Sequence, residues 1–170
     1  MVRIPEELRI ITHPLTFTEE PAKVLAAKRG DLIHTALSLI EKVPSRRELE
    51  GAVRRAFVLL GEDEGRWRIK EDFLNPLERI FELEQVKDWF AEGTLALREM
   101  EVVDEEGGLR RLDRVVVKEG LLDVIEYKVG HREGWHRGQV REYVRLLQRV
   151  FPGEIRGFIL YIDEAAVVRV

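Results

Sequence analysis

Apolar residues recur at helical spacing in the first half of the chain and alternate with polar residues in much of the second half. Around residues 21–43 they return every three or four positions, as on the buried face of an amphipathic helix. Gly30 is expected to interrupt this helix, because glycine is destabilising in a helix interior. The positions that define the apolar face are Ile33, Ala36, Leu37 and Ile40.

Two further helices are expected before the strand-rich half. Ser45 and Glu48 form a capping-box pattern ahead of a second apolar helical face. The next helix is expected to begin at Asn75, as its N-cap, to continue through Trp89 and to end at Gly93. The part of the chain over 1–93 is therefore predicted to be mainly helical.

The part over 94–170 is predicted to form the sheet, because short alternating or apolar runs are separated there by turn residues. The expected elements are strands at 95–103, 109–117 and 121–129, a helix at 134–151, a strand at 155–162 and a candidate further strand at 166–170. The fold class predicted from this order is α/β, with a small mixed sheet (β-β-β-α-β) flanked by helices.

Length and composition fit one compact domain over 1–170, since 45% of the 170 residues are hydrophobic. No cysteine is present, which excludes a disulfide framework, a zinc-thiolate site and an iron–sulfur cluster. No apolar run is long enough to span a bilayer, and the first residues lack a signal-peptide core. A cytoplasmic location without a membrane partner is therefore expected.

Two charged residues interrupt the otherwise apolar run at 121–129. In a strand, Glu126 and Lys128 share a face, and their apolar neighbours indicate that the strand is largely buried. Charge in such a strand needs compensation, because burial of an unpaired charge is costly. A structural Glu–Lys pair beside a polar rim is one explanation, and a functional site is the other.

Asp113 in the preceding strand favours the functional explanation. The turn between the two strands places Asp113 opposite either Ile125 or Glu126, depending on a one-residue shift of register. In both cases the two carboxylates are close and repel each other unless one is protonated or a cation lies between them. Mg²⁺ is held in proteins by one or two carboxylates and water, and Lys128 is placed to stabilise charge on a phosphate.

Asp113 followed after twelve residues by Glu126-Tyr127-Lys128 resembles the signature of the PD-(D/E)xK nucleases. Further features are similar to the RecB/AddA-like branch of that superfamily and together cover the chain from about residue 22 to its end. They are the helix with Gly30 and His34, the acidic Glu99, the pair Asp113-Arg114, and Gln139 with Tyr143 four residues later.

The resemblance implies a restriction-endonuclease-like core and a role for each matching residue. The implied metal ligands are His34, Asp113, Glu126 and the Tyr127 carbonyl. Lys128 is implied to act on the nucleophile and the scissile phosphate, and Glu99 to assist through water or a second metal. Gln139 and Tyr143 are implied to hold the active site and the nucleic-acid strand. The implied cofactor is Mg²⁺ or Mn²⁺, without an iron–sulfur cluster.

The charge of the chain is unevenly distributed, although its net value of −4 is not that of a protein that coats DNA. The segment 131–150 carries five arginines, several at four-residue spacing: Arg137, Arg141, Arg145 and Arg149. A solvated helix face explains this row as well as phosphate contact does. Contact with nucleic acid is expected first for Arg132 and Arg137, nearest the active strand, and for Arg114 beside Asp113.

The expected function is hydrolysis of phosphodiester bonds in DNA by a metal-dependent deoxyribonuclease. The resemblance implies exonuclease or end-processing activity in recombination or repair. The chain has no Gly-rich phosphate loop, so a helicase motor would lie elsewhere in the same protein or in another chain. Two alternatives remain open: a catalytically inactive nuclease fold that binds DNA or scaffolds a helicase, and an interaction domain without a nucleic-acid role.

Overall fold

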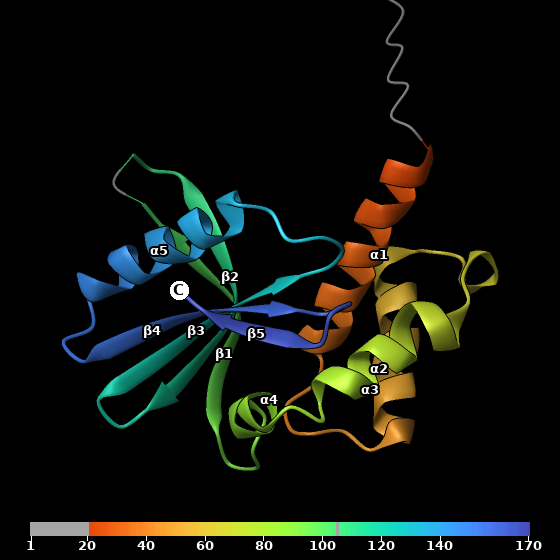
Figure 1. Ribbon diagram of the computed structural model, residues 1–170, viewed down its shortest axis with the longest axis horizontal. Coiled ribbons are helices and arrows are strands. Elements are labelled where there is room, and N and C mark those ends of the chain that lie inside the picture. Colours follow the sequence, from red (N-terminus) through yellow and green to blue (C-terminus); the bar gives the residue numbers. More distant parts are fainter. Residues whose placement is uncertain (1–20, 105) are drawn as a thin grey trace, which may run out of the picture.

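The structure, a computed structural model, describes residues 21–104 and 106–170. The segment 1–20, where no signal-peptide core is expected, and Glu105 of the expected turn lie outside the described residues. Helices come first along the chain and strands follow (Figure 1). The elements are α1 (Pro21–Ser38), α2 (Arg46–Leu60), η1 (Glu64–Arg66), η2 (Lys70–Leu74), α3 (Asn75–Ile80), α4 (Glu84–Trp89), β1 (Leu95–Val103), β2 (Leu109–Lys118), β3 (Leu121–Lys128), α5 (Trp135–Gln148), β4 (Glu154–Tyr161) and β5 (Ala166–Arg169).

The strands form one mixed sheet in the order β1-β2-β3-β4-β5. β3 and β4 are parallel and are connected through α5, while the other neighbouring pairs are antiparallel. A parallel pair needs such a crossover, because a tight turn cannot return the chain in the same direction. The predicted α/β class, with a mixed β-β-β-α-β sheet flanked by helices, is confirmed, and the candidate strand at 166–170 is β5.

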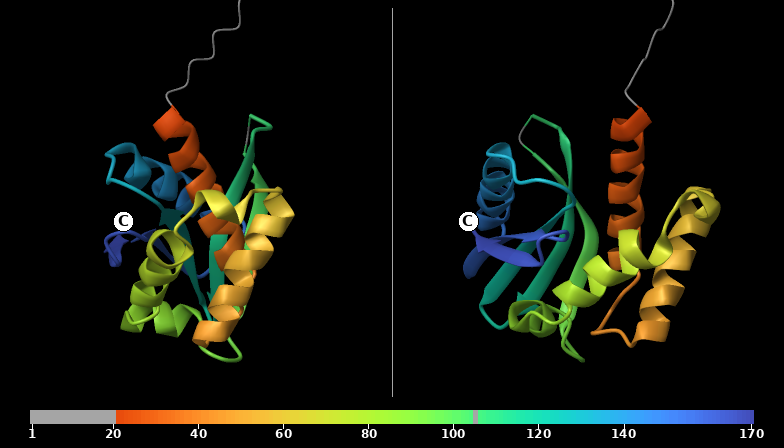
Figure 2. Two further views of the ribbon diagram at one scale, coloured as in Figure 1. Left: turned by 90° about the vertical axis from the view of Figure 1, so that its right-hand side faces the viewer. Right: turned by 45° about the vertical axis from the view of Figure 1, so that its right-hand side comes forward.

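Helices cover both faces of the sheet, with α5 on one side and α1 to α4 on the other (Figure 2). The apolar side of α5 packs on β2 and β3 through Tyr143, Leu147, Val115 and Val124. The opposite face contributes a larger core with the N-terminal helices, including Val116, Ile125 and Tyr127. Because β3 is covered on both faces, polar side chains on it need partners within the protein.

The hairpin between β2 and β3 decides the register that the sequence left open. The strands turn at Gly120, whose φ of 67° suits glycine. Arg114 pairs with Ile125, and continuing this register places Asp113 level with Glu126. The two carboxylates therefore start from opposite positions on neighbouring strands.

The first helix differs from the prediction in two respects, whereas the second begins as predicted. α1 continues through Gly30 without interruption and ends at Ser38, several residues before the expected end. The capping box of α2 is confirmed: Ser45 Oγ accepts from the Glu48 N–H, and the Glu48 carboxylate accepts from the Ser45 N–H at 2.7 Å. The capping pattern was a local signal, whereas the end of α1 depends on packing.

The predicted third helix is wrong at its start and in its continuity. The chain is already helical at Asn75, because the π-helix Lys70–Leu74 runs directly into α3. Asn75 therefore has helical angles, φ −60° and ψ −46°, and its N–H bonds to the Lys70 carbonyl. The helix stops at Ile80, so Trp89 belongs to the separate helix α4.

No helix within residues 21–104 and 106–170 combines the length and apolar character needed to cross a lipid bilayer.

Candidate metal centre

The backbone of β1 and β2 departs from regular strand geometry where two acidic residues face each other. Glu99 has a φ of 51°, a value that non-glycine residues adopt at a cost of about 1–3 kcal/mol. The β1–β2 pairing is regular at Arg98 and Met100 on either side of it. Glu99 stands level with Asp113 in this register. Backbone strain of this kind collects at functional sites, because the surrounding structure must hold it in place.

Asp113 joins three elements through its carboxylate, which is almost fully buried at 5% exposure. One oxygen, Oδ1, lies 3.0 Å from Nδ1 of His34 on α1. The other, Oδ2, accepts the backbone N–H of Tyr127 on β3 at 2.7 Å. The structure thus brings His34, Asp113 and strand β3 together, although His34 and Asp113 are 79 residues apart in the sequence.

Glu126 and Lys128 lie on the α5 side of β3 and form a chain of contacts into that helix. Lys128 Nζ is 2.8 Å from Glu126 Oε1 and also donates to Gln139 Oε1 at 2.8 Å. The Gln139 amide then donates to the Tyr143 hydroxyl at 2.7 Å. Gln139 and Tyr143 therefore hold the ammonium group of Lys128 over the strand, as supporting residues of this site.

One cavity of about 520 Å³ is lined by side chains from all of these elements, including His34, Asp113 and Glu126. It opens between α1, the sheet and the first turns of α5, and its lining is largely polar. The lining residues are Gly30, Asp31, His34, Thr35, Ser38, Leu60, Glu99, Arg111, Asp113, Glu126 and Gln139. Gly30 borders the cavity, yet a Cβ there would meet no atom within 4 Å, so close packing does not require this glycine.

Three acids of the cavity have a cationic or imidazole partner within the protein, so a metal ion is not needed to make the proximity of Asp113 and Glu126 tolerable. Asp113 faces His34, Glu126 pairs with Lys128, and Glu99 pairs with Nε of Arg111 at 2.8 Å. These pairs explain how the fold accommodates the acids. Sequence reasoning did not identify Arg111, whose exposed side chain lines the cavity.

The charge of the Glu126 carboxylate is only partly compensated by its partners. Its Oε2 atom is buried and has no hydrogen-bond partner. Burial, followed by the charge of Asp113, raises the pKa of Glu126 to about 7, although Lys128 and His34 act in the opposite direction. Burial lowers the pKa of His34, but the hydrogen bond and charge of Asp113 and the charge of Glu126 outweigh it, so the net shift is upward. The centre therefore holds protons that a cation could replace.

Glu99 belongs to the same electrostatic unit. Burial raises its pKa, the Arg111 charge lowers it and the nearby Asp113 raises it, with a net upward shift. Its carboxylate lines the cavity. This position agrees with the expected supporting role, which stays a prediction.

The donor set suits a hard divalent cation, since it consists of two carboxylates and an imidazole, with one carboxylate oxygen lacking any partner. Within the described residues, no three His, Asp or Glu side chains form a ready-made metal site. His34 and Lys128 occupy the carboxylate oxygens that an ion would take. The Tyr127 carbonyl as a ligand stays a prediction, and its amide contacts Asp113 instead.

The three arginines expected to contact nucleic acid differ in their surroundings. The expectation is wrong for Arg114, which is 1% exposed and lies 3.6 Å from the centre of the Phe90 ring. Arg114 also donates to the carbonyl groups of Ile40 and Glu41 in the segment after α1, so no surface remains for a phosphate. Arg132 forms an ion pair with Glu164 at 2.7 Å. Arg137 is exposed.

Sequence reasoning also missed the contacts that fix α1 against the sheet. Arg29 forms two hydrogen bonds to Asp163, at 2.9 and 2.6 Å, and Asp163 also accepts the Gly130 N–H at 2.8 Å. Asp163 therefore links the helix that carries His34 to the segment that follows Lys128. A separation of 134 residues along the chain leaves no local signal for this pair.

We expect the raised pKa of Glu126 to make the metal-free protein less stable as pH rises. The folded state binds this proton more tightly than the unfolded chain, so stability falls from about pH 4.5 through about pH 7. Urea unfolding at about pH 5 and about pH 8 measures the loss, and Glu126→Gln should reduce it. Glu119→Gln, in an exposed turn, is the control. An equal loss in wild type and Glu126→Gln would refute this assignment.

No protein-family model matches the chain, and no curated protein matches it. Among solved structures, the chain is similar to the crystal structure of SSO0001, with 16% sequence identity and a TM-score of 0.35. The match covers 84% of this chain and 64% of that chain. A likeness at this level carries no argument about activity.

Proposed function

We propose that this chain is a metal-dependent nuclease of the PD-(D/E)xK type that hydrolyses phosphodiester bonds in DNA. The observation that carries the proposal is the convergence of His34, Asp113, Glu126 and Lys128 from three elements, at a cavity where one Glu126 oxygen is buried and unpaired. Asp113 and Glu126 stand level on neighbouring strands. The resemblance in motif order supports the same conclusion.

The resemblance gives each residue of the centre a role. Asp113, Glu126 and His34 would hold Mg²⁺ or Mn²⁺, and such an ion, when bound, polarises the phosphate and lowers the pKa of a bound water. Lys128 carries a positive charge next to these ligands, where it can orient a water molecule or stabilise charge on the phosphate. Gln139 fixes the Lys128 ammonium group in this position.

The proposed substrate is DNA with free ends, and the proposed setting is end processing in recombination or repair. Both come from the resemblance. A helicase motor is the partner that the resemblance implies. It would lie elsewhere in the same protein or in another chain, because this sequence carries no phosphate-binding loop of the Gly-rich type.

Metal-dependent cleavage tests the proposal directly. Purified protein is incubated with labelled single-stranded DNA and linear duplex DNA, with Mn²⁺ or with chelator. Wild type should cut in Mn²⁺ alone, and Asp113→Ala should not cut. DNA binding without cleavage by the wild type would favour an inactive nuclease fold, and neither binding nor cleavage would favour an interaction domain.

Metal binding can be measured separately from cleavage. At a Mn²⁺ concentration about 100 times the Kd, binding should stabilise the folded protein by about 2.7 kcal/mol, which corresponds to a rise in Tm of about 5–10 °C. Glu126→Ala should abolish this rise, because it removes a carboxylate from the ligand set. Glu119→Ala should keep it. A wild-type Tm that does not respond to Mn²⁺ would count against the metal centre.

A further inference from the structure

Three arginines on α5 have no partner among the described residues, whereas most of the described arginines have one. Ion pairs engage arginines elsewhere in the structure, such as Arg29 with Asp163 and Arg156 with Asp123. On α5, by contrast, three exposed guanidinium groups have no hydrogen-bond, ion-pair or ring partner in the described part of the chain: Arg137, Arg141 and Arg145.

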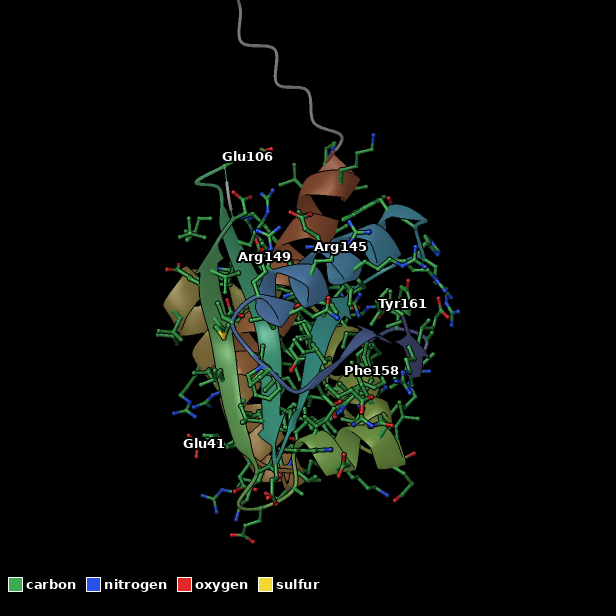
Figure 3. All side chains as sticks on the ribbon, turned by 90° about the vertical axis from the view of Figure 1, so that its left-hand side faces the viewer. Glu41, Glu106, Arg145, Arg149, Phe158 and Tyr161 are labelled. Atoms are coloured by element: carbon green, nitrogen blue, oxygen red, sulfur yellow. The ribbon has the colours of Figure 1, made fainter. Side chains whose placement is uncertain are left out.

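These arginines form a row along the helix. Residues four apart lie on nearly the same face and about 6 Å apart along the axis. The view onto the α5 side of the molecule shows Arg145 and Arg149 on successive turns (Figure 3). Arg149 continues the spacing but has an interaction of its own, so the row of free charges is Arg137, Arg141 and Arg145.

The acidic residue within this row does not neutralise it. Glu142 is directed toward β2, where its carboxylate accepts from Nε of Arg110 at 3.1 Å. Glu133, before the helix, accepts from the indole N–H of Trp135. The outer face of α5 is therefore positively charged in a protein whose formal net charge is −4.

A hollow of about 220 Å³ lies beside the row, between α5 and the end of the sheet. Its wall combines two guanidinium groups with apolar side chains: Arg141, Val144, Arg145, Ile155, Gly157 and Val170. Gly157 allows α5 to approach β4 closely, because a Cβ there would lie 2.6 Å from Cγ1 of Val140. Positively charged side chains beside an apolar surface suit a ligand that joins an anionic group to a less polar part, such as the phosphate and sugar of a nucleotide.

The row lies on the helix that also contacts the candidate metal centre, but on the outer side of that helix. Gln139, which contacts Lys128, is two residues from both Arg137 and Arg141, and residues two apart point to opposite sides of a helix. We propose that Arg137, Arg141, Arg145 and the hollow form a track for the phosphodiester backbone of the DNA that the centre cuts. This inference rests on the proposed function, and it assigns to α5 the sequence-independent part of DNA binding.

The salt dependence of DNA binding tests the track. The probe is a fluorescently labelled linear duplex, with binding measured by anisotropy in chelator so that no cleavage occurs. Each phosphate contact contributes about 0.9 to the slope of log K against log salt concentration for duplex DNA. Arg141→Gln/Arg145→Gln should therefore reduce the slope by about 1.8. A control pair on α2, Arg47→Gln/Arg54→Gln, removes two exposed charges and should leave the slope unchanged.

The track and the nuclease proposal fail in different ways. If the wild type does not cleave DNA, but the salt slope of DNA binding is reduced in the α5 variant and not in the α2 variant, the track stands and the nuclease proposal is overturned. The opposite result is that the wild type cleaves and the salt slope of DNA binding is either unchanged in the α5 and α2 variants or reduced equally in both. That result would overturn the track and leave the nuclease proposal standing. Thermal melting of each variant confirms that the substitutions leave the fold intact.

Discussion

Lys128→Ala is expected to slow Mn²⁺-dependent DNA cleavage by about 10²–10³-fold, the loss usual for removal of one preorganised electrostatic group. Lys128 is held between the Glu126 carboxylate and the Gln139 amide oxygen, at 2.8 Å from each. The substitution removes the charge nearest the proposed reaction, but it leaves His34, Asp113 and Glu126 in place. Cleavage should therefore fall while the metal site is kept.

The measurement is the single-turnover rate on a labelled linear duplex at saturating Mn²⁺. The rise in Tm with Mn²⁺ should persist in Lys128→Ala, which separates loss of chemistry from loss of metal. Lys70→Ala, at an exposed position on η2, is the matched control and should cut at the wild-type rate. A Lys128→Ala rate within twofold of wild type would mean that the ammonium group has no part in the reaction.

The second large effect is on stability and concerns Asp123, whose side chain is fully buried near the start of β3. Arg156 donates to its carboxylate twice, at 2.6 and 2.8 Å, and Lys118 lies 3.3 Å away. Asp123→Ala leaves both cations without this partner. Breaking a buried ion pair costs about 3–5 kcal/mol, and we expect about 3 kcal/mol because Arg156 and Lys118 remain partly exposed.

The midpoint of urea unfolding, converted with the slope m, measures this loss. Glu154→Ala removes one member of an exposed pair with Arg169 and should change the midpoint little, because exposed ion pairs contribute little to stability. Below its melting temperature, Asp123→Ala should still bind Mn²⁺, since Asp123 lies at the opposite end of β3 from Lys128. A wild-type midpoint in Asp123→Ala would contradict the assignment of this cluster to stability.

Local patterns predicted much of the fold. The capping box of α2 and the β2–β3 hairpin depend on residues close together in sequence, and both are present in the structure. The helix at Asn75 failed because a π-helix precedes it, and a capping pattern cannot reveal whether the chain is already helical. The end of α1 likewise depends on packing that no short window contains.

In the candidate site, too, local patterns placed some residues and could not place others. Strand alternation placed Glu126 and Lys128 on one face, and the hairpin placed Asp113 beside them. The contribution of His34 came from the resemblance, because nothing local connects α1 to β2. Arg114 shows the limit of reasoning from charge, since an arginine packed on Phe90 and bonded to backbone carbonyls looks in sequence like a surface cation.

The pairs of the cavity also explain how the centre could exist with and without an ion. His34 and Lys128 compensate Asp113 and Glu126 in the absence of metal, because each of these two acids has a partner within the protein. The unpaired oxygen and the raised pKa of Glu126 mark the place where that compensation is weakest. Above about pH 7 the carboxylate loses its proton more readily, and affinity for a divalent ion should rise.

Anomalous diffraction from a crystal soaked in Mn²⁺ at about pH 8 would test the central claim most directly. We expect one strong peak in the cavity, within coordination distance of Asp113, Glu126 and His34 together. A peak bonded to other residues, or no peak among these three in a protein that still cuts DNA, would contradict it.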